Sequence, residues 1–279
     1  MRRMLPDADR TLPVEGPLNL RATLAPMRRG PGDPTVRFDD DAVWRAARTP
    51  EGPVSLRLAP EGMGVHASAW GEGAAWMVER VADLLGLDDD DEGFRPDTPM
   101  LKRLHRQFRG MRFGRTGQVM EALVPTILSQ RVTGPNAGRS WKEVVWRYGE
   151  RAPGPRKLWV APDPRRLAVL APWELNRCGV EARRGEVLVR ACRVARRMEE
   201  AAGMTSEAAA ERLMVVRGVG AWTAAKVIRV VLGDPDVVPT GDFHLPHTVA
   251  WALAGEPRGT DERMLELLEP YRPHRGRVV

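Results

Sequence analysis

The sequence has few cysteines and no long apolar segment, and each shortage excludes a class of protein. Cys178 and Cys192 are its only cysteines among 279 residues, too few for a disulfide framework or an all-cysteine metal site. No segment approaches the roughly 18 to 20 consecutive apolar residues of a membrane-spanning helix. The first ten residues, MRRMLPDADR, lack the apolar core of a secretory signal. We therefore expect a cytoplasmic protein with reduced thiols.

The positive charge is unevenly distributed along the chain. The sequence carries a formal net charge of +6, yet residues 1–100 hold 12 Lys and Arg against 18 Asp and Glu. The excess of positive charge therefore belongs to residues 101–279, which suits a partner of dense negative charge, nucleic acid before membrane. A coding bias toward arginine produces the same composition, so charge alone does not identify the partner.

Short, partly alternating apolar segments occupy the chain from Leu18 to about Gly71. They are LNLRATL, PTVRF, AVWRAART, VSLRLAP and GVHASAW, and the segments between them are rich in Pro, Gly and Asp. This pattern predicts a small antiparallel sheet. Apolar residues then recur at helical spacing over residues 74–87, with Gly86 as a C-terminal stop. The acidic, Pro-containing stretch 88–99 indicates a domain boundary.

After this boundary the pattern is helical almost throughout. Apolar residues recur at helical spacing in MLKRLHRQF, GQVMEALVPTILSQRV, AGRSWKEVVWRYG, EARRGEVLVRACRVARRMEE, SEAAAERLMVV, TAAKVIRVVLG and PHTVAWALAG. We therefore predict an α+β fold, with a small N-terminal antiparallel sheet in an α+β domain over residues 1–95 and an all-α region over residues 96–279. Four tryptophans of the second region are expected in its core, Trp141, Trp146, Trp173 and Trp251.

One turn between two predicted helices has an unusual composition. Residues 215–226 read VVRGVGAWTAAK, and Arg217, Gly218, Val219 and Gly220 form the turn. Glycine tolerates φ > 0 and permits close approach, and the start of a helix presents unpaired N–H groups that bind phosphate. Such a unit can hold a nucleic-acid backbone without reading bases. An ordinary tight turn has the same composition, so the turn alone leaves both interpretations open.

The stretch LMVVRGVGAWTA resembles the helix-hairpin-helix of DNA glycosylases, and further segments resemble the same superfamily in the same order. EALVPTILSQRVTGPNAGRSW and DPRRLAVLAPWELNRCGVEARRGEVLVRAC precede the hairpin, and VVPTGDFHLPHTV follows it. The resemblance covers residues 100–275, and the sheet before it is typical of the 3-methyladenine DNA glycosylase II (AlkA-like) branch. It implies two helical subdomains around an active-site cleft. It also implies DNA-backbone contacts by the hairpin residues Arg217, Gly218, Val219, Gly220 and Thr223.

The resemblance implies a catalytic aspartate in the loop PTGDF, which is Asp242. Breaking an N-glycosidic bond builds positive charge on the sugar, and a buried carboxylate stabilises that charge and can activate water. Asp242 is also a candidate helix N-cap, a role compatible with catalysis. Relatives that also cut the strand use a lysine nucleophile at the position that Trp222 occupies here. The resemblance therefore implies a monofunctional enzyme that leaves an abasic site in an intact strand.

Three further side chains are assigned to the base pocket. Trp222 and Tyr271 are expected to hold an electron-poor base by stacking and cation–π attraction, with core packing as the alternative. Lys226 stands four residues after Trp222 on the same helix face, where AlkA-like proteins have an aromatic pocket residue. Lys226 can contact phosphate, lie near the pocket or act as an off-position nucleophile, and the sequence leaves these roles open.

A side chain must fill the gap that a flipped nucleotide leaves in the duplex. The resemblance places this role in the segment SQRVTG. Gln130 matches the glutamine of the family, and Arg131 stands where the AlkA-like branch has an apolar wedge. Arg131 either fills the gap or contacts phosphate from the surface.

The implied partner is duplex DNA that contains a damaged base, bound by a monomer at the nucleoid. No side-chain metal site and no iron–sulfur cluster are expected, because the sequence has no Cys-rich tail. A monovalent cation held by hairpin carbonyls is a family feature without a side-chain signature. We expect excision of alkylated purines such as 3-methyladenine, with the N-terminal domain as a structural support. The alternatives are another lesion such as 8-oxoguanine, or a DNA-binding protein without excision activity.

Overall fold

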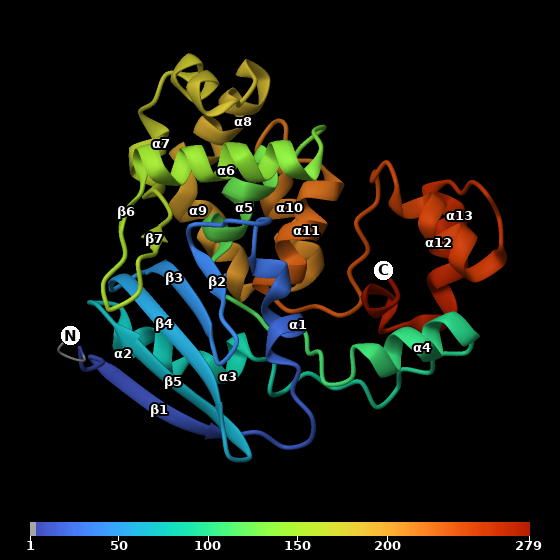
Figure 1. Cartoon of the computed structure of the whole chain (residues 1–279). Coiled ribbons are helices and arrows are strands. Elements are labelled where there is room, and N and C mark those ends of the chain that lie inside the picture. The colour runs from blue at the N-terminus through green and yellow to red at the C-terminus, as the bar shows by residue number, and fades with distance from the viewer. Residues whose placement is uncertain (1–3) are drawn as a thin grey trace.

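A five-stranded antiparallel sheet forms one layer of the computed structural model, which describes residues 4–279. The strands lie in the order β1-β5-β4-β3-β2 (Figure 1). Their bounds are Ala8–Pro13 for β1, Val36–Phe38 for β2, Val43–Thr49 for β3, Gly52–Glu61 for β4 and Gly64–Trp70 for β5. The predicted α+β fold with a small N-terminal antiparallel sheet is confirmed.

Two segments at the start of the chain differ from the prediction. LNLRATL is not a strand, because Leu20–Leu24 forms helix α1. The Oδ1 atom of Asn19 accepts from the N–H of Ala22 at 3.0 Å and caps this helix. Strand β1 was not expected, because its segment ADRTLP lacks apolar alternation. It is an edge strand that pairs only with β5, and charged residues and proline suit such an edge.

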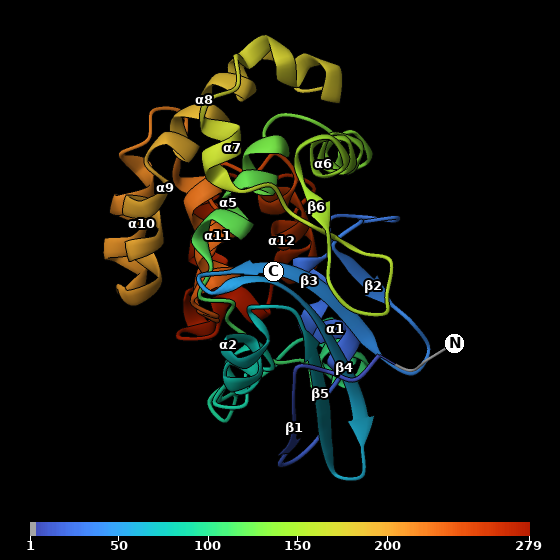
Figure 2. The same cartoon turned by 90° about the vertical axis from the view of Figure 1, so that its left-hand side faces the viewer.

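Two short helices pack against the sheet, and the hydrophobic core continues from there into the helical region. Helices α2 (Ala74–Glu79) and α3 (Val81–Leu84) replace the single predicted helix, and Gly86 follows them with φ +61°. One cluster of buried side chains joins the sheet to the helical region. Figure 2 shows the helices of this region above the sheet. Buried side chains from both sides of the predicted boundary between residues 95 and 96 therefore share one cluster, and the division into two domains stays a prediction.

The sheet and the helices that share its core form the larger of two bodies. Seven helices and three 3-10 turns make up most of this larger body. They are α5 (Val119–Leu128), α6 (Gly134–Tyr148), α7 (Pro164–Ala168), α8 (Ala182–Arg193), α9 (Ala195–Glu199), α10 (Ser206–Met214), α11 (Ala221–Val231), η1 (Ala25–Met27), η2 (Pro172–Cys178) and η3 (Glu200–Gly203). The predicted long basic helix is interrupted at Val194. A two-stranded ladder of β6 (Glu150–Arg151) and β7 (Trp159–Val160) interrupts the predicted all-α region.

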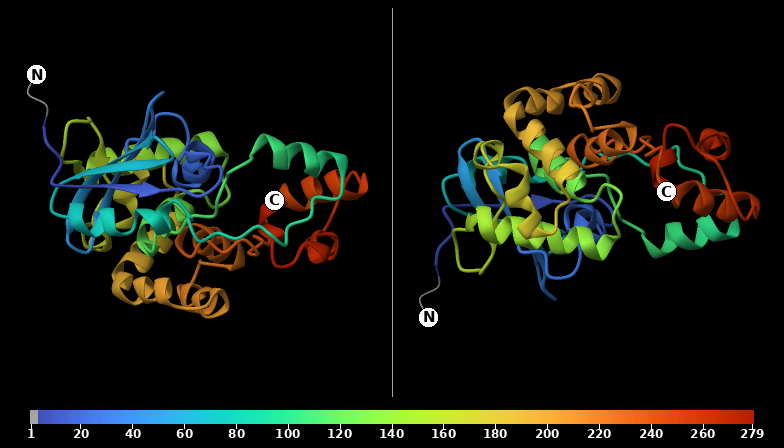
Figure 3. Two further views of the ribbon diagram at one scale, coloured as in Figure 1. Left: turned by 90° about the horizontal axis from the view of Figure 1, so that it is seen from below. Right: turned by 90° about the horizontal axis from the view of Figure 1, so that it is seen from above.

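A smaller lobe has its own hydrophobic cluster. The lobe is formed by the last part of the chain together with α4 (Pro99–Gln107). The last part contains α12 (Leu245–Ala254), α13 (Asp261–Leu268), η4 (Glu269–Tyr271) and η5 (Arg275–Arg277). The cluster is built from Phe94, Leu101, Val249, Met264, Leu268 and Tyr271. Figures 1 and 3 show this lobe to one side of the larger body. In the described part of the chain, no helix combines the length and apolar character of a membrane span.

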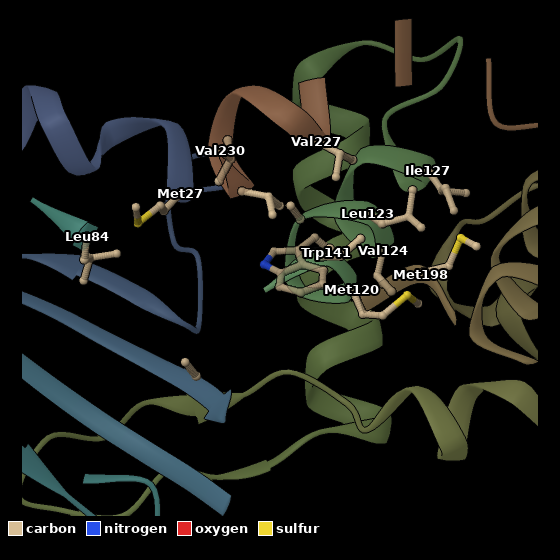
Figure 4. Packing of buried hydrophobic residues seen from close by; sticks show 14 of the residues in the cluster. Met27, Leu84, Met120, Leu123, Val124, Ile127, Trp141, Met198, Val227 and Val230 are labelled. Carbon is tan, nitrogen blue, oxygen red and sulfur yellow. The ribbon is translucent and has the colours of Figure 1, made fainter. Parts of the chain in front are cut away.

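The junction of sheet and helices contains a buried ion pair as well as apolar packing. Arg45 of β3 is 4% exposed and donates to Glu121 of α5 at 2.5 Å. The indole N–H of Trp141 in α6 donates to Asp33, in the loop before β2, at 3.1 Å. Figure 4 shows Trp141 among side chains of α5, with Met27 and Val230 nearby. The N-terminal sheet is thus fixed to the helical body by directional contacts.

Candidate active site

The hairpin between α10 and α11 contains two glycines, and the structure constrains these two positions differently. Gly218 has φ +101°, and a Cβ atom there would lie 2.3 Å from Cγ2 of Val187, so only glycine fits. Gly220 has φ −108° and precedes α11 as its N-cap. A Cβ atom at Gly220 would meet open space. The fold itself therefore does not require glycine at 220, and the start of α11 is open to an approaching anion.

Gln130, directly after α5, is bound to the hairpin. Its Nε2 atom donates to the carbonyl of Gly218 at 3.0 Å and to the hydroxyl of Thr223 at 2.9 Å. Thr223 is 2% exposed, and its hydroxyl is bound within the protein, while its predicted contact with the DNA backbone stays a prediction. The structure thus places Gln130 as a link between α5 and the hairpin, and its role in filling a DNA gap stays a prediction.

The backbone of Arg131 lies in the left-handed region, which residues other than glycine rarely adopt. Its φ is +54°, and it is the one non-glycine residue with positive φ in the described part of the chain. Arginine has no intrinsic preference for this region, which costs energy for residues with a Cβ atom. The side chain is exposed, on the segment that also holds Gln130 against the hairpin. The side chain of Arg131 therefore lies in solvent, while the hydrogen bond of the neighbouring Gln130 holds its backbone against the hairpin.

Asp242 lies between the hairpin helix α11 and the start of α12. Its Oδ1 atom accepts from the backbone N–H groups of His244 at 2.9 Å and Leu245 at 3.0 Å. Its Oδ2 atom accepts from the indole N–H of Trp222 at 2.8 Å. One oxygen thus binds the amides at the start of α12 and the other faces α11, while the catalytic role of Asp242 stays a prediction.

The electrostatic surroundings keep this carboxylate ionised. Partial burial opposes the charge of Asp242, but the hydrogen bonds from Trp222 and from two backbone amides, together with the nearby Lys226, lower its pKa below the ordinary value. Lys226 is an exposed residue. The loss of hydration beside the protein lowers the pKa of its ammonium, Asp242 opposes this shift, and Arg229 and Arg29 add to it. The structure thus brings Asp242, Trp222 and Lys226 together.

Lys226 lies over the ring of Trp222. Its Nζ atom is 5.5 Å from the ring centroid, within the range of a cation–π contact. The ammonium of Lys226 therefore lies over one face of the indole, while the N–H edge of the indole contacts the carboxylate of Asp242. The sequence left three roles open for Lys226. Its position over Trp222 favours the second of them, a place near the predicted pocket.

Phe243 is an aromatic residue of the site that sequence reasoning missed. It follows Asp242 directly and is 81% exposed, with its ring against that of His244 at 4.9 Å between centroids. The signal in the sequence was an apolar residue in a polar loop, between an aspartate and a histidine.

Several aromatic residues lie elsewhere than expected. Tyr271 is 8% exposed, packs in the cluster of the smaller lobe and donates its hydroxyl to Asp97. This is the packing alternative, and its place in a base pocket stays a prediction. Trp141 is in the core as predicted, at 3% exposure. The core prediction is wrong for three other tryptophans, which are between 47% and 61% exposed: Trp146, Trp173 and Trp251.

Comparisons with known proteins agree on one group of relatives. No family model matches the sequence. A DNA-3-methyladenine glycosylase of Bacillus subtilis is 26% identical over 204 residues, which is 70% of this chain and 67% of that protein. The similarity therefore covers the greater part of both chains.

Solved structures share the whole architecture. A 3-methyladenine DNA glycosylase from Archaeoglobus fulgidus superposes with a TM-score of 0.82 at 20% identity, over 96% of this chain and 94% of its own. An 8-oxoguanine glycosylase/lyase of Clostridium acetobutylicum, in complex with DNA, has a TM-score of 0.74 at 14% identity, over 99% and 96%. At such identities the likeness establishes the common fold, including the N-terminal sheet.

Proposed function

The chain belongs to the helix-hairpin-helix DNA glycosylase superfamily, and from this premise we propose that it is a monofunctional DNA glycosylase that excises alkylated purines from duplex DNA. The observation that carries the proposal is the hydrogen bond between Trp222 and Asp242. It joins the hairpin helix, the part suited to hold DNA, to an ionised carboxylate. A protein that only bound DNA would gain nothing from a carboxylate facing a polyanion.

The carboxylate of Asp242 supplies the charge that the reaction needs. As the N-glycosidic bond breaks, positive charge builds on the sugar, and a fixed carboxylate stabilises this charge without rearrangement. Asp242 is ionised at neutral pH, because its pKa lies below the ordinary value of a carboxyl group. An ionised carboxylate can also accept a proton from the attacking water. Both roles need the three hydrogen bonds that orient its oxygens.

The DNA backbone would lie across the open start of α11. Gly220 leaves the first amides of this helix accessible, and a helix N-terminus favours phosphate. The exposed Arg131, held with positive φ, is the side chain best placed on this segment to fill the space of a flipped nucleotide. Flipping costs a few kcal/mol and is least costly for a damaged or mispaired base.

Trp222 distinguishes base removal from strand cutting. The indole has no amine to form a Schiff base with the opened sugar, so the product is an abasic site in an intact strand. The exposed ring of Phe243 beside Asp242 adds a surface on which an electron-poor alkylated base can stack. The Bacillus and Archaeoglobus relatives are named for 3-methyladenine, which supports an alkylated purine as the first candidate.

A neutral lesion such as 8-oxoguanine is the second candidate, favoured by the position of Lys226. Its ammonium lies 5.5 Å from the centre of the Trp222 ring, where it would repel a cationic alkylated base. The Clostridium neighbour is titled an 8-oxoguanine glycosylase/lyase. A base with carbonyl oxygens would instead gain a hydrogen-bond donor from Lys226.

An excision assay decides between these substrates. Duplexes carrying 3-methyladenine, 7-methylguanine, hypoxanthine or 8-oxoguanine are incubated with the protein, and released bases are measured. We expect base release with strands that break only after alkali treatment. No release from any duplex would contradict the proposal.

Borohydride trapping tests the monofunctional assignment separately. Borohydride reduces a Schiff base to a stable adduct, so wild-type protein should give no covalent protein–DNA product. An adduct that disappears in Lys226→Ala would show that Lys226 is a nucleophile and would contradict the monofunctional assignment.

A further inference from the structure

A carboxylate of the smaller lobe holds the residue directly before Asp242. The Oδ2 atom of Asp261, the first residue of α13, accepts from the N–H of Gly241 at 2.8 Å. Gly241 has φ +78°, and a Cβ atom there would lie 4.0 Å from Cβ of Trp222. The hydrogen bond therefore fixes a residue that adjoins both Trp222 and Asp242.

Glycine alone does not fix the chain at this point. Glycine adopts positive and negative φ about equally readily, so the chain can leave Gly241 in more than one direction. Each direction would point the side chain of Asp242 differently. Because the contact with Asp261 selects one conformation of Gly241, it also selects one direction for the carboxylate of Asp242.

The start of α13, which carries Asp261, is itself firmly placed. The hydroxyl of Thr260 caps this helix by accepting from the N–H of Arg263 at 3.2 Å. Gly259 packs against α12 so closely that a Cβ atom there would lie 2.6 Å from the carbonyl oxygen of Pro246. Asp261 thus holds Gly241 from a rigid support.

The loop that carries Asp242 has a second anchor in the smaller lobe. Arg275 donates to both carboxylate oxygens of Asp236, from Nε to Oδ1 at 2.9 Å and from Nη2 to Oδ2 at 2.6 Å. The smaller lobe therefore holds this loop at two points, and the contact at Gly241 is the one that adjoins Asp242.

The other oxygen of Asp261 indicates that the residue does more than stabilise its helix. Among the residues that the structure describes, Oδ1 of Asp261 is buried and has no hydrogen-bond partner. A buried acceptor without a partner costs free energy, and such a group calls for an explanation other than stability. The contact of Asp261 with Gly241 supplies one.

We propose that Asp261 is a positioning residue for the reaction, which sets the direction of the Asp242 carboxylate by fixing the peptide of Gly241. The inference rests on the proposed function, because it gives Asp242 the reacting role. Asp261 acts through Asp242 and not on the DNA. Its loss should therefore lower the rate of base release and leave the affinity for DNA unchanged.

The indole N–H signal of Trp222 in a nitrogen–proton NMR spectrum reports the position of Asp242 without any reaction. Loss of the signal in Trp222→Phe assigns it, and its shift in Asp242→Asn marks the loss of the carboxylate acceptor. Asp261→Ala should move the signal toward its position in Asp242→Asn. Asp261→Asn keeps an acceptor for Gly241 and should leave the signal near its wild-type position. An unmoved signal in Asp261→Ala would overturn the proposal.

Single-turnover base release shows whether Asp261 acts through Asp242. Asp261→Ala should lower the rate about tenfold, because a small misplacement of a reacting group is costly, while the dissociation constant for undamaged duplex stays within about twofold. In the Asp242→Asn background the same substitution should have no further effect, since residues that act as one unit are not additive. An equal loss of rate in both backgrounds would overturn the proposal.

Glu262→Ala is the matched control. Glu262 is the next residue of α13, is exposed, and its replacement removes the same charge from the same turn of helix. This variant should keep the wild-type NMR signal and rate, and a change equal to that in Asp261→Ala would contradict a specific role. If the wild type releases no base while the indole signal moves as expected, the proposed activity fails but the contact that positions Asp242 is supported.

Discussion

Replacement of Asp242 by asparagine separates the charge of the carboxylate from its role as a helix cap. Asparagine caps helices about as well as aspartate, so its Oδ1 atom can still accept from His244 and Leu245. The amide that replaces Oδ2 carries no charge and offers no acceptor to the indole N–H of Trp222. The variant should therefore fold like the wild type while the transition state loses its counter-charge.

The expected loss follows from the electrostatics of the site. A unit charge about 4 Å from the sugar cation, at an effective dielectric constant of about 20, contributes about 4 kcal/mol. That energy corresponds to a factor of about 10³ in rate. Binding of undamaged duplex should stay equal or become slightly tighter, because the substitution removes a negative charge that faces the phosphates.

Single-turnover base release from a duplex with one lesion measures this effect, with enzyme in excess so that product release does not limit the rate. Asp163→Asn is the matched control, because Asp163 caps α7 by accepting from the N–H of Arg165 at 2.7 Å. The control should release base at the wild-type rate. If Asp242→Asn stays within about tenfold of wild type, the charge supplies less than about 1.4 kcal/mol and the reasoning is refuted.

Other substitutions test the turn, the acidity of the carboxylate and the junction. Gly218→Ala should lower the free energy of unfolding by roughly 1–3 kcal/mol, seen as a lower melting temperature, because its φ and its close neighbour exclude a Cβ atom. Gly220→Ala should melt like the wild type but bind DNA more weakly, and equal binding would argue against phosphate at this amide. Trp222→Phe removes a hydrogen bond that lowers the pKa of Asp242, so the acidic limb of the pH–rate profile should move to higher pH; an unmoved limb would contradict the assignment. Arg45→Met should cost about 2 to 4 kcal/mol in urea unfolding, less than for a fully buried pair because its carboxylate partner is 24% exposed.

The features that sequence predicted well are those with local causes. The helices on both sides of the hairpin follow from apolar spacing, and the turn between them follows from the two glycines that the sequence shows there. Four of the five strands of the sheet were predicted from alternation and turn residues. The exception, β1, owes its place to pairing with β5, which no local pattern encodes.

The features that sequence missed depend on which surfaces meet in the fold. Trp146 and Trp251 lie on helices as predicted, but the faces that carry them are not covered by another element, and both are exposed. Likewise, the sequence named Trp222 and Asp242 separately, but they are 20 positions apart in the chain. Their hydrogen bond arises only when α11 and the loop after it fold back on each other, and local patterns do not encode such a contact.

The hydrogen bond between Trp222 and Asp242 joins the larger body to the smaller lobe, which have separate hydrophobic clusters. The chain crosses from one body to the other between Val237, which packs with the larger cluster, and Val238, which packs with the smaller one. Trp222 lies on α11, whose apolar face packs in the first body, while Asp242 accepts from the N–H of Leu245, the first residue of α12 in the second. A rotation that opens the angle between the bodies would lengthen this bond and remove one of the three contacts that orient the carboxylate. The orientation of the reacting group is therefore tied to the relative position of the two lobes.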